Sequence, residues 1–194
     1  MSFLLFFIFL ALSLSLVLSF VKRGGAVKGA RIFRFASVLA ATAFFTHWFF
    51  RESVTPVVQN AMGLQLINQL PQPVDFYIIK KGRGSAPDQT MHPGKIRPEH
   101  FRIAYLSMQD SDEFWIAGYI GKKNMVYFSQ HLVPNKNMDQ IVETRNYIIQ
   151  SQKLAAQAKR AVEAYSVSNI STGVWVTLAL LLLFMNTILL LQRK

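Results

Sequence analysis

The chain contains no cysteine and few charged residues. Only 16% of its 194 residues are Asp, Glu, Lys or Arg, against about 25% in a typical soluble domain. Without cysteine there is no disulfide framework, no thiolate metal site and no cysteine nucleophile. Apolar residues make up 52% and aromatic residues 13% of the chain, which excludes a disordered protein and indicates that part of it lies outside water.

Three stretches of the sequence are apolar, free of charge and about long enough to cross a membrane. They cover residues 2–21, residues 35–50 with an extension to 32 past Arg34, and residues 174–191. A helix of about 20 residues crosses a hydrocarbon core of about 30 Å. We therefore predict spans over 2–21 and 32–50 joined by a basic loop, 22–31, and a third span in 173–194. A cleaved signal peptide carries basic residues before its apolar stretch, and the first span has none there.

The distribution of charge predicts the direction of the spans. Residues 22–34 hold five basic residues and no acid, the tail ends in Arg193 and Lys194, and all ten acids lie in residues 51–172. The positive-inside rule places the loop and the C-terminus in the cytoplasm. The N-terminus and residues 51–172 then lie outside it, as expected for a bacterial inner membrane protein. Because 7 of the 11 net positive charges are juxtamembrane, we expect no nucleic-acid or nucleotide partner.

Residues 51–172 are long enough for one extracytoplasmic α+β domain inserted between the second and third spans. Apolar spacing after Thr55-Pro56 predicts an amphipathic helix to residue 70, where prolines end it. Segments rich in β-branched and aromatic residues predict an antiparallel sheet of about four strands, with a hairpin turn at 121–124 and an exposed loop over 81–99. The four segments are 74–79, 101–106, 114–120 and 125–133.

A second helix is predicted from Met138 to Tyr165, with Asn137 as its N-cap. Its apolar residues recur seven apart, among them Ile141 and Ile148. This stripe either covers the sheet or is shared with a partner helix. Whether the helix continues into the last span is left open by the sequence.

Several residues are candidates for contacts with lipid or protein partners. The small residues Ala36, Ser37, Ala40 and Ala41 lie four apart in pairs and allow close helix packing, while Asn186 needs a polar partner inside the membrane. Trp48 and Trp175 are predicted interfacial anchors, each at the outward end of its span. Candidate partner contacts in the domain are Lys80, Lys81, Arg83, Ile141 and Ile148.

Residue patterns for catalysis or metal binding are absent from the sequence. The four histidines form no H-x-x-x-H or H-E-x-x-H pair, and no catalytic or metal-site motif surrounds them. We therefore predict no catalytic residue, no metal and no cofactor. His47, near the outward end of the second span, is the one candidate for a haem or quinone contact.

These observations predict a non-catalytic accessory subunit or assembly factor of a larger membrane complex, acting through helix packing and its extracytoplasmic domain. The bilayer and other membrane subunits are its expected partners. Two alternatives remain open at this stage. One is a redox, haem or quinone-associated subunit that uses His47, and the other is a transmembrane sensor that signals through a partner.

Overall fold

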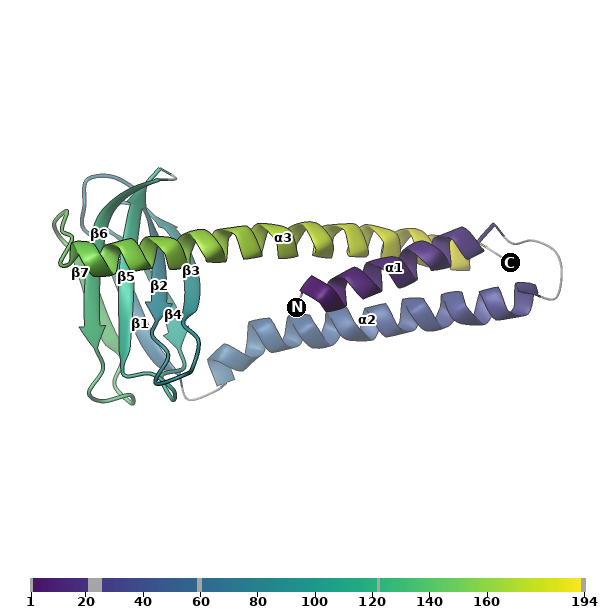
Figure 1. Ribbon diagram of the computed structural model, residues 1–194, viewed down its shortest axis with the longest axis horizontal. Coiled ribbons are helices and arrows are strands. Elements are labelled where there is room, and N and C mark those ends of the chain that lie inside the picture. Colours follow the sequence, from purple (N-terminus) through teal and green to yellow (C-terminus); the bar gives the residue numbers. More distant parts are fainter. Residues whose placement is uncertain (1, 21–25, 59–60, 122, 193–194) are drawn as a thin grey trace. The chain divides into compact units, whose positions relative to one another are not determined.

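The computed structural model describes residues 2–20, 26–58, 61–121 and 123–192. The chain divides into two compact units. The helical unit comprises Met1–Glu52 and Val167–Lys194, and the β domain comprises Ser53–Ser166. Within the described residues there are three helices and seven strands (Figure 1).

The three helices differ from the predicted spans in length. They are α1 (Ser2–Leu18), α2 (Ala26–Val58) and α3 (Gln152–Leu191). Because α2 already begins at Ala26, the prediction of a loop over 22–31 is wrong for residues 26–31, and residues 21–25 lie outside the described part. Lys28 and Arg31 are therefore helical residues.

Two of the described helices are long and apolar enough to span a membrane: Val27–Arg51 of α2, and α3. Helix α1 has 17 residues and a length of about 26 Å, which is shorter than a hydrocarbon core of about 30 Å. Among the described residues two helices therefore meet the length expected of a span, and α1, which ends at Leu18, does not show the third predicted span.

The β domain contains two sheets. The three-stranded sheet has the order β4-β1-β7 and the four-stranded sheet the order β3-β2-β5-β6. Strand β1 pairs antiparallel with β4 and parallel with β7, whereas every pair in the other sheet is antiparallel. The strands are β1 (Met62–Asn68), β2 (Val74–Lys80), β3 (Gln89–Ile96), β4 (His100–Leu106), β5 (Glu113–Ile120), β6 (Asn124–Leu132) and β7 (Gln140–Thr144).

The four predicted segments are strands, namely β2, β4, β5 and β6. The prediction that they form one antiparallel sheet of about four strands is wrong, because β4 pairs with β1 in the other sheet, which also contains a parallel pair. The predicted hairpin is confirmed, since β5 pairs antiparallel with β6 across the turn. Gly121 in that turn has a φ of 69°, a left-handed conformation that glycine adopts without steric cost.

The prediction of an amphipathic helix from Thr55 to residue 70 is wrong from residue 61 onward, while residues 59–60 lie outside the described part. Helix α2 continues to Val58, and β1 occupies residues 62–68. Met62, Leu64 and Leu66 lie in the core between the sheets, and from Leu64 onward buried residues alternate with half-buried ones. Over so few residues, an alternating spacing of apolar residues cannot be distinguished from a helical one. These residues form a strand because they pair with β4 and β7.

The prediction of an exposed loop over 81–99 is wrong for residues 89–96, which form the edge strand β3. Phe76 pairs with Gly94 but Ile78 pairs with Met91, so two residues of β3 face one residue of β2. Pro93 lies in this irregularity. A proline, which has no N–H to donate, is tolerated in a strand at an edge or a bulge.

The predicted helix over 138–165 is also wrong in its first half. Residues 140–144 form β7, and α3 begins at Gln152. The cap is Ser151 rather than Asn137, because the Ser151 Oγ accepts a hydrogen bond from the Leu154 N–H at 3.4 Å. From there α3 continues without a break to Leu191, which answers the question of continuity that the sequence left open.

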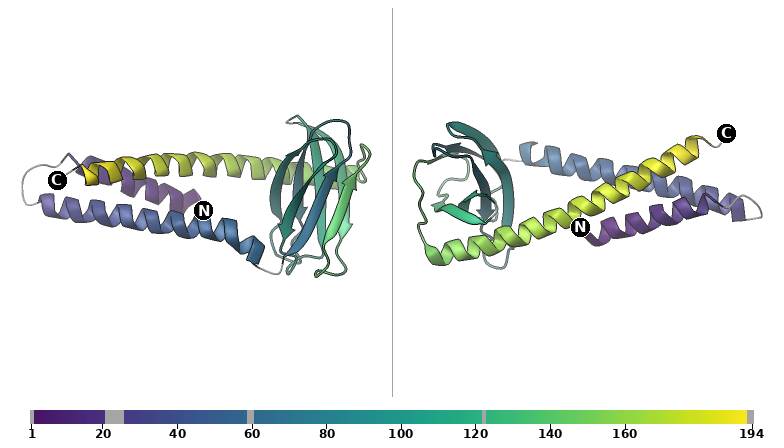
Figure 2. Two further views of the ribbon diagram at one scale, coloured as in Figure 1. Left: turned by 180° about the vertical axis from the view of Figure 1, so that it is seen from behind. Right: turned by 90° about the horizontal axis from the view of Figure 1, so that it is seen from above.

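Side chains of alternate residues in the four-stranded sheet enter two different cores. Phe76 and Ile78 of β2 face the core between the sheets, whereas Ile79 packs under α3. Strand β5 is buried on both faces for the same reason. The first turns of α3 cover the second core with Ala155, Ala158 and Val162 (Figures 1 and 2). The β domain is therefore layered as sheet, sheet and helix.

Candidate interaction surfaces

The outer face of the three-stranded sheet carries exposed apolar side chains beside the polar Gln65 and Glu143. Leu64, Leu66 and Leu106 point inward and are at most 3% exposed. The alternate residues of β4 point the other way, and Phe101, Ile103 and Tyr105 are 56%, 53% and 42% exposed. A face of this kind on a soluble surface indicates a binding site.

The strand register joins these side chains into one surface. Gln65 of β1 is paired with Ile103 of β4 on one side and with Ile141 of β7 on the other. Ile67 is likewise paired with Phe101. We call this set, Phe101, Ile103, Tyr105, Ile67 and Ile141, the outer sheet face.

The two predicted isoleucine contacts, Ile141 and Ile148, lie on different parts of the β domain. Ile141 is 65% exposed and belongs to the outer sheet face, whereas Ile148 lies before α3 and is 47% exposed. The two are therefore not on one helical stripe.

The three basic residues make contacts within the β domain. Lys80 is buried, and its Nζ donates to the Ser107 carbonyl at 3.0 Å. Lys81 forms an ion pair with Asp88 and lies 4.4 Å from the centre of the Trp115 ring. Arg83 remains exposed on its loop, 3.7 Å from Asp112.

The small residues of α2 border α1. Ala36, Ser37, Ala40 and Ala41 line a groove of about 420 Å³ together with side chains of α1. Ala41 is buried, and Ala36 and Ala40 are exposed.

Asn186 links α3 to α1 through its side-chain amide. The amide oxygen accepts from the Ser15 hydroxyl at 2.7 Å, and the amide nitrogen donates to the Leu12 carbonyl at 3.0 Å and to the Leu182 carbonyl at 2.9 Å. Both Asn186 and Ser15 are fully buried. The amide thus has the polar partners that its position requires.

The two tryptophans pack against phenylalanine rings of the helical unit. Trp175 makes edge-to-face contacts with Phe6 and Phe9 of α1, with ring centres 5.5 Å apart in both cases. Trp48 lies 6.4 Å from Phe45 of the same helix. Their role as interfacial anchors stays a prediction.

Each histidine of the β domain has a local partner. His92 Nε2 lies 2.7 Å from the Asp75 carboxylate, and its ring stacks on Tyr77. His131 lies 2.8 Å from the Ser129 hydroxyl, and burial lowers the pKa of its imidazole. His47 is exposed on α2. Among the described residues no three His, Asp or Glu side chains are grouped closely enough to hold a metal ion.

Three tyrosines cluster where β2, β5 and α3 meet. Tyr77 makes edge-to-face contacts with Tyr119 and Tyr165, at 5.7 and 6.4 Å. Burial raises the pKa of Tyr119 to about 12, and the negative charge of Glu163 adds to that rise. These phenols therefore stay protonated at neutral pH and contribute as packed aromatic surface.

Sequence reasoning missed the outer sheet face, because that surface depends on which strands pair. The signal for it was present in residues 101–105, where apolar side chains occupy alternate positions. Comparisons of this chain with protein-family models, with curated proteins and with solved structures found no match.

Proposed function

We propose that this chain is an integral membrane protein that serves as a non-catalytic accessory subunit or assembly factor of a larger membrane complex. The observation that carries the proposal is the outer sheet face, an apolar surface with Ile103 53% and Ile141 65% exposed. Burial of such side chains against another protein is favourable by about 25 cal/mol per Å². The partner is a further subunit of the complex.

Helices α2 and α3 support insertion into a bilayer. In α2 a charge-free run over residues 35–50 is flanked by Arg34 and Arg51, the arrangement expected when cations lie at the two headgroup regions. With α2 and α3 as spans, the positive-inside rule puts Lys28 and the C-terminus in the cytoplasm and residues 51–172 outside it. This orientation suits the inner membrane of a bacterium and does not depend on α1.

Labelling of single cysteines tests the topology directly, since the chain has no thiol of its own. Asp110 and Lys28 are both exposed. In intact cells a membrane-impermeant maleimide is expected to label Asp110→Cys and to spare Lys28→Cys. The reverse pattern contradicts the orientation, and recovery of the chain in the soluble fraction contradicts membrane insertion.

Purification in a mild detergent tests the role as a subunit. The wild-type chain is expected to co-purify with a stoichiometric partner, and Ile103→Lys is expected to lose it because the lysine charge must be desolvated in the interface. Leu132→Lys is the matched control, since Leu132 is 69% exposed at the end of β6 in the other sheet.

Two results contradict the proposal. One is a wild-type chain that runs alone and turns over a substrate. The other is equal retention of the partner by the Ile103→Lys and Leu132→Lys variants, which would show that the outer sheet face is not the contact.

A further inference from the structure

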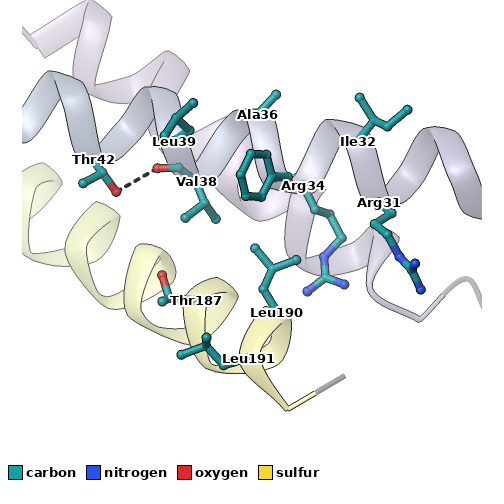
Figure 3. Close-up of a pocket in the computed structure, with 11 residues that line it drawn as sticks. Arg31, Ile32, Arg34, Ala36, Val38, Leu39, Thr42, Thr187, Leu190 and Leu191 are labelled. Carbon is teal, nitrogen blue, oxygen red and sulfur yellow. Dashed lines mark hydrogen bonds between the residues drawn. The ribbon is translucent and has the colours of Figure 1, made fainter. Parts of the chain in front are cut away.

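A groove runs along α2 beside the C-terminal turns of α3, within the helical unit. Its volume is about 800 Å³. The walls are mostly aliphatic and aromatic, with Phe35, Val38 and Leu39 from α2 and Leu190 and Leu191 from α3 (Figure 3). The hydroxyls of Thr42 and Thr187 in its lining donate to the Val38 and Leu183 carbonyls of their own helices, so in a bilayer the groove is filled by hydrocarbon rather than by water.

One end of the groove is cationic. Arg31 and Arg34 line it, and their spacing of three residues puts both on the same face of α2. Figure 3 shows both side chains extending toward the same side of α2, with the Arg34 guanidinium near Leu190 and Arg31 further toward the start of the helix. Arg31 is exposed, whereas Arg34 is only 1% exposed.

These arginines lie at the boundary of the charge-free run of α2, which begins at residue 35. The hydrocarbon part of the groove extends from there to Thr42, a distance of about 12 Å for eight residues at 1.5 Å each. The cationic end therefore falls at the level of the lipid headgroups and the apolar end at the level of the acyl chains.

We propose that this groove binds one anionic glycerophospholipid. The phosphate accepts hydrogen bonds from the exposed guanidinium group of Arg31, and the positive charge of the buried Arg34 one turn along α2 strengthens the attraction. An acyl chain lies against Val38, Leu39 and Leu190. A guanidinium offers paired N–H donors that match phosphate oxygens. The inference rests on the membrane insertion proposed above.

Charge complementarity favours an anionic lipid over a neutral one. The residues of the helical unit include eight Lys or Arg and one acid, Glu52, which gives 8 minus 1, or +7. Glu52 is 18 positions from Arg34 along the chain. Basic pockets between membrane helices on the cytoplasmic side are known to select anionic headgroups.

Native mass spectrometry of the full chain, released from nanodiscs, measures the lipid retained. The probe lipids are phosphatidylglycerol, which carries a net negative charge, and phosphatidylcholine, which does not. We expect one phosphatidylglycerol retained, with at least tenfold tighter binding than phosphatidylcholine, which corresponds to about 1.4 kcal/mol. Retention of both lipids to the same extent overturns the inference, because it would mean that the groove holds ordinary surrounding lipid.

Arg31→Gln combined with Arg34→Gln is expected to abolish the preference for phosphatidylglycerol. The control is Arg51→Gln, which removes a positive charge at the other end of the same charge-free run, outside the groove. Loss of the preference in Arg51→Gln as well overturns the inference, since it would then reflect net charge.

A second variant leaves both arginines in place and fills the groove. Leu39 lines the groove and is 61% exposed, so Leu39→Trp adds bulk there while leaving the buried contacts intact. We expect Leu39→Trp to displace phosphatidylglycerol, and unchanged retention overturns the inference. A polypeptide in place of the lipid also overturns it.

The same preparation separates the two proposals. A wild-type chain that fails to enter nanodiscs removes the membrane insertion on which both depend. A chain that enters them, keeps the topology given by cysteine labelling and shows no lipid preference removes the lipid site alone.

Discussion

Replacing Asn186 by leucine is expected to loosen the contact between α1 and α3. The change removes two hydrogen bonds between the helices, one from the Ser15 hydroxyl at 2.7 Å and one to the Leu12 carbonyl at 3.0 Å. Hydrogen bonds between membrane helices contribute about 0.6 kcal/mol on average and at most about 1.7. The two together are therefore worth about 1.2 kcal/mol, or about an eightfold change in the equilibrium between packed and separated helices.

The assay is a titration of the folded chain in detergent micelles with sodium dodecyl sulfate. Trp175 reports on the contact, because its ring packs on Phe6 and Phe9 of α1. In a background that replaces Trp48 and Trp115 by phenylalanine, Trp175 is the one remaining tryptophan. Separation of α1 then increases the quenching of Trp175 by a brominated detergent.

Thr187→Val is the matched control. The Thr187 hydroxyl donates to the Leu183 carbonyl of its own helix at 2.8 Å, so this change removes a polar group of similar size at a neighbouring position. We expect its midpoint to stay close to that of the parent protein. A double-mutant cycle with Ser15→Ala is expected to show a coupling with Asn186→Leu of about 0.6 kcal/mol.

Two results would refute this reasoning. Equal midpoints for Asn186→Leu and Thr187→Val would mean that the interhelical bonds contribute nothing. A coupling near zero in the cycle would mean that Ser15 and Asn186 do not interact, and α1 would then be held by other contacts or not at all.

Three further predictions concern the β domain, with urea unfolding of the full chain as the measurement. Gly118→Ala brings a Cβ within 2.9 Å of Val74 and 3.0 Å of Phe76, so it is expected to lower the free energy of unfolding by about 1–3 kcal/mol through overpacking. Burial lowers the pKa of His131 from 6.5, so the unfolded state takes up the proton first as the pH falls. The wild-type free energy of unfolding should therefore decrease below pH 6.5, and it should decrease less in His131→Gln. The Tyr119 hydroxyl is buried with no hydrogen-bond partner among the described residues, and Tyr119→Phe should therefore raise the free energy of unfolding by about 1 kcal/mol and remove a phenol that titrates at about pH 12.

Each of these predictions has a contradicting result. An unchanged midpoint for Gly118→Ala would show that the neighbouring side chains move aside at no cost. Parallel pH profiles for wild type and His131→Gln would exclude His131 as the group that titrates. A less stable Tyr119→Phe would show that the hydroxyl has a hydrogen-bond partner after all.

Two of the strands that sequence patterns predicted correctly have a local composition that strongly favours a strand. Residues 74–79 and 114–120 are dense in β-branched and aromatic residues, and turn residues such as Gly121 follow the second of them. Both strands lie in the middle of the four-stranded sheet. Burial on both faces explains why residues 114–120 form a continuous apolar run rather than an alternating one, whereas β2 alternates at its start, where Asp75 and Tyr77 are half-buried.

The strands that were missed depend on partners distant in the chain. Residues 62–68 match a helical and an alternating spacing equally well, and only pairing with residues 100–106 and 140–144 makes them β1. Pro93 indicated a loop, yet it lies at an irregularity of an edge strand where its missing N–H costs no hydrogen bond. A helix was predicted over residues 138–151 because apolar residues recur seven apart there. The prediction fails because residues with this spacing need not belong to one element, and residues 140–144 form β7.

The sequence by itself determined that this protein has apolar helices flanked by cations and a β-rich segment between them. Helix formation over α2 and α3 needs only local hydrogen bonds and an apolar surface, so composition is sufficient to predict it. The tertiary structure alone decided which side chains stay exposed. The outer sheet face, the bonds of Asn186 and the groove beside Arg34 each join residues far apart in the chain, and the folding of that chain is what brings them together.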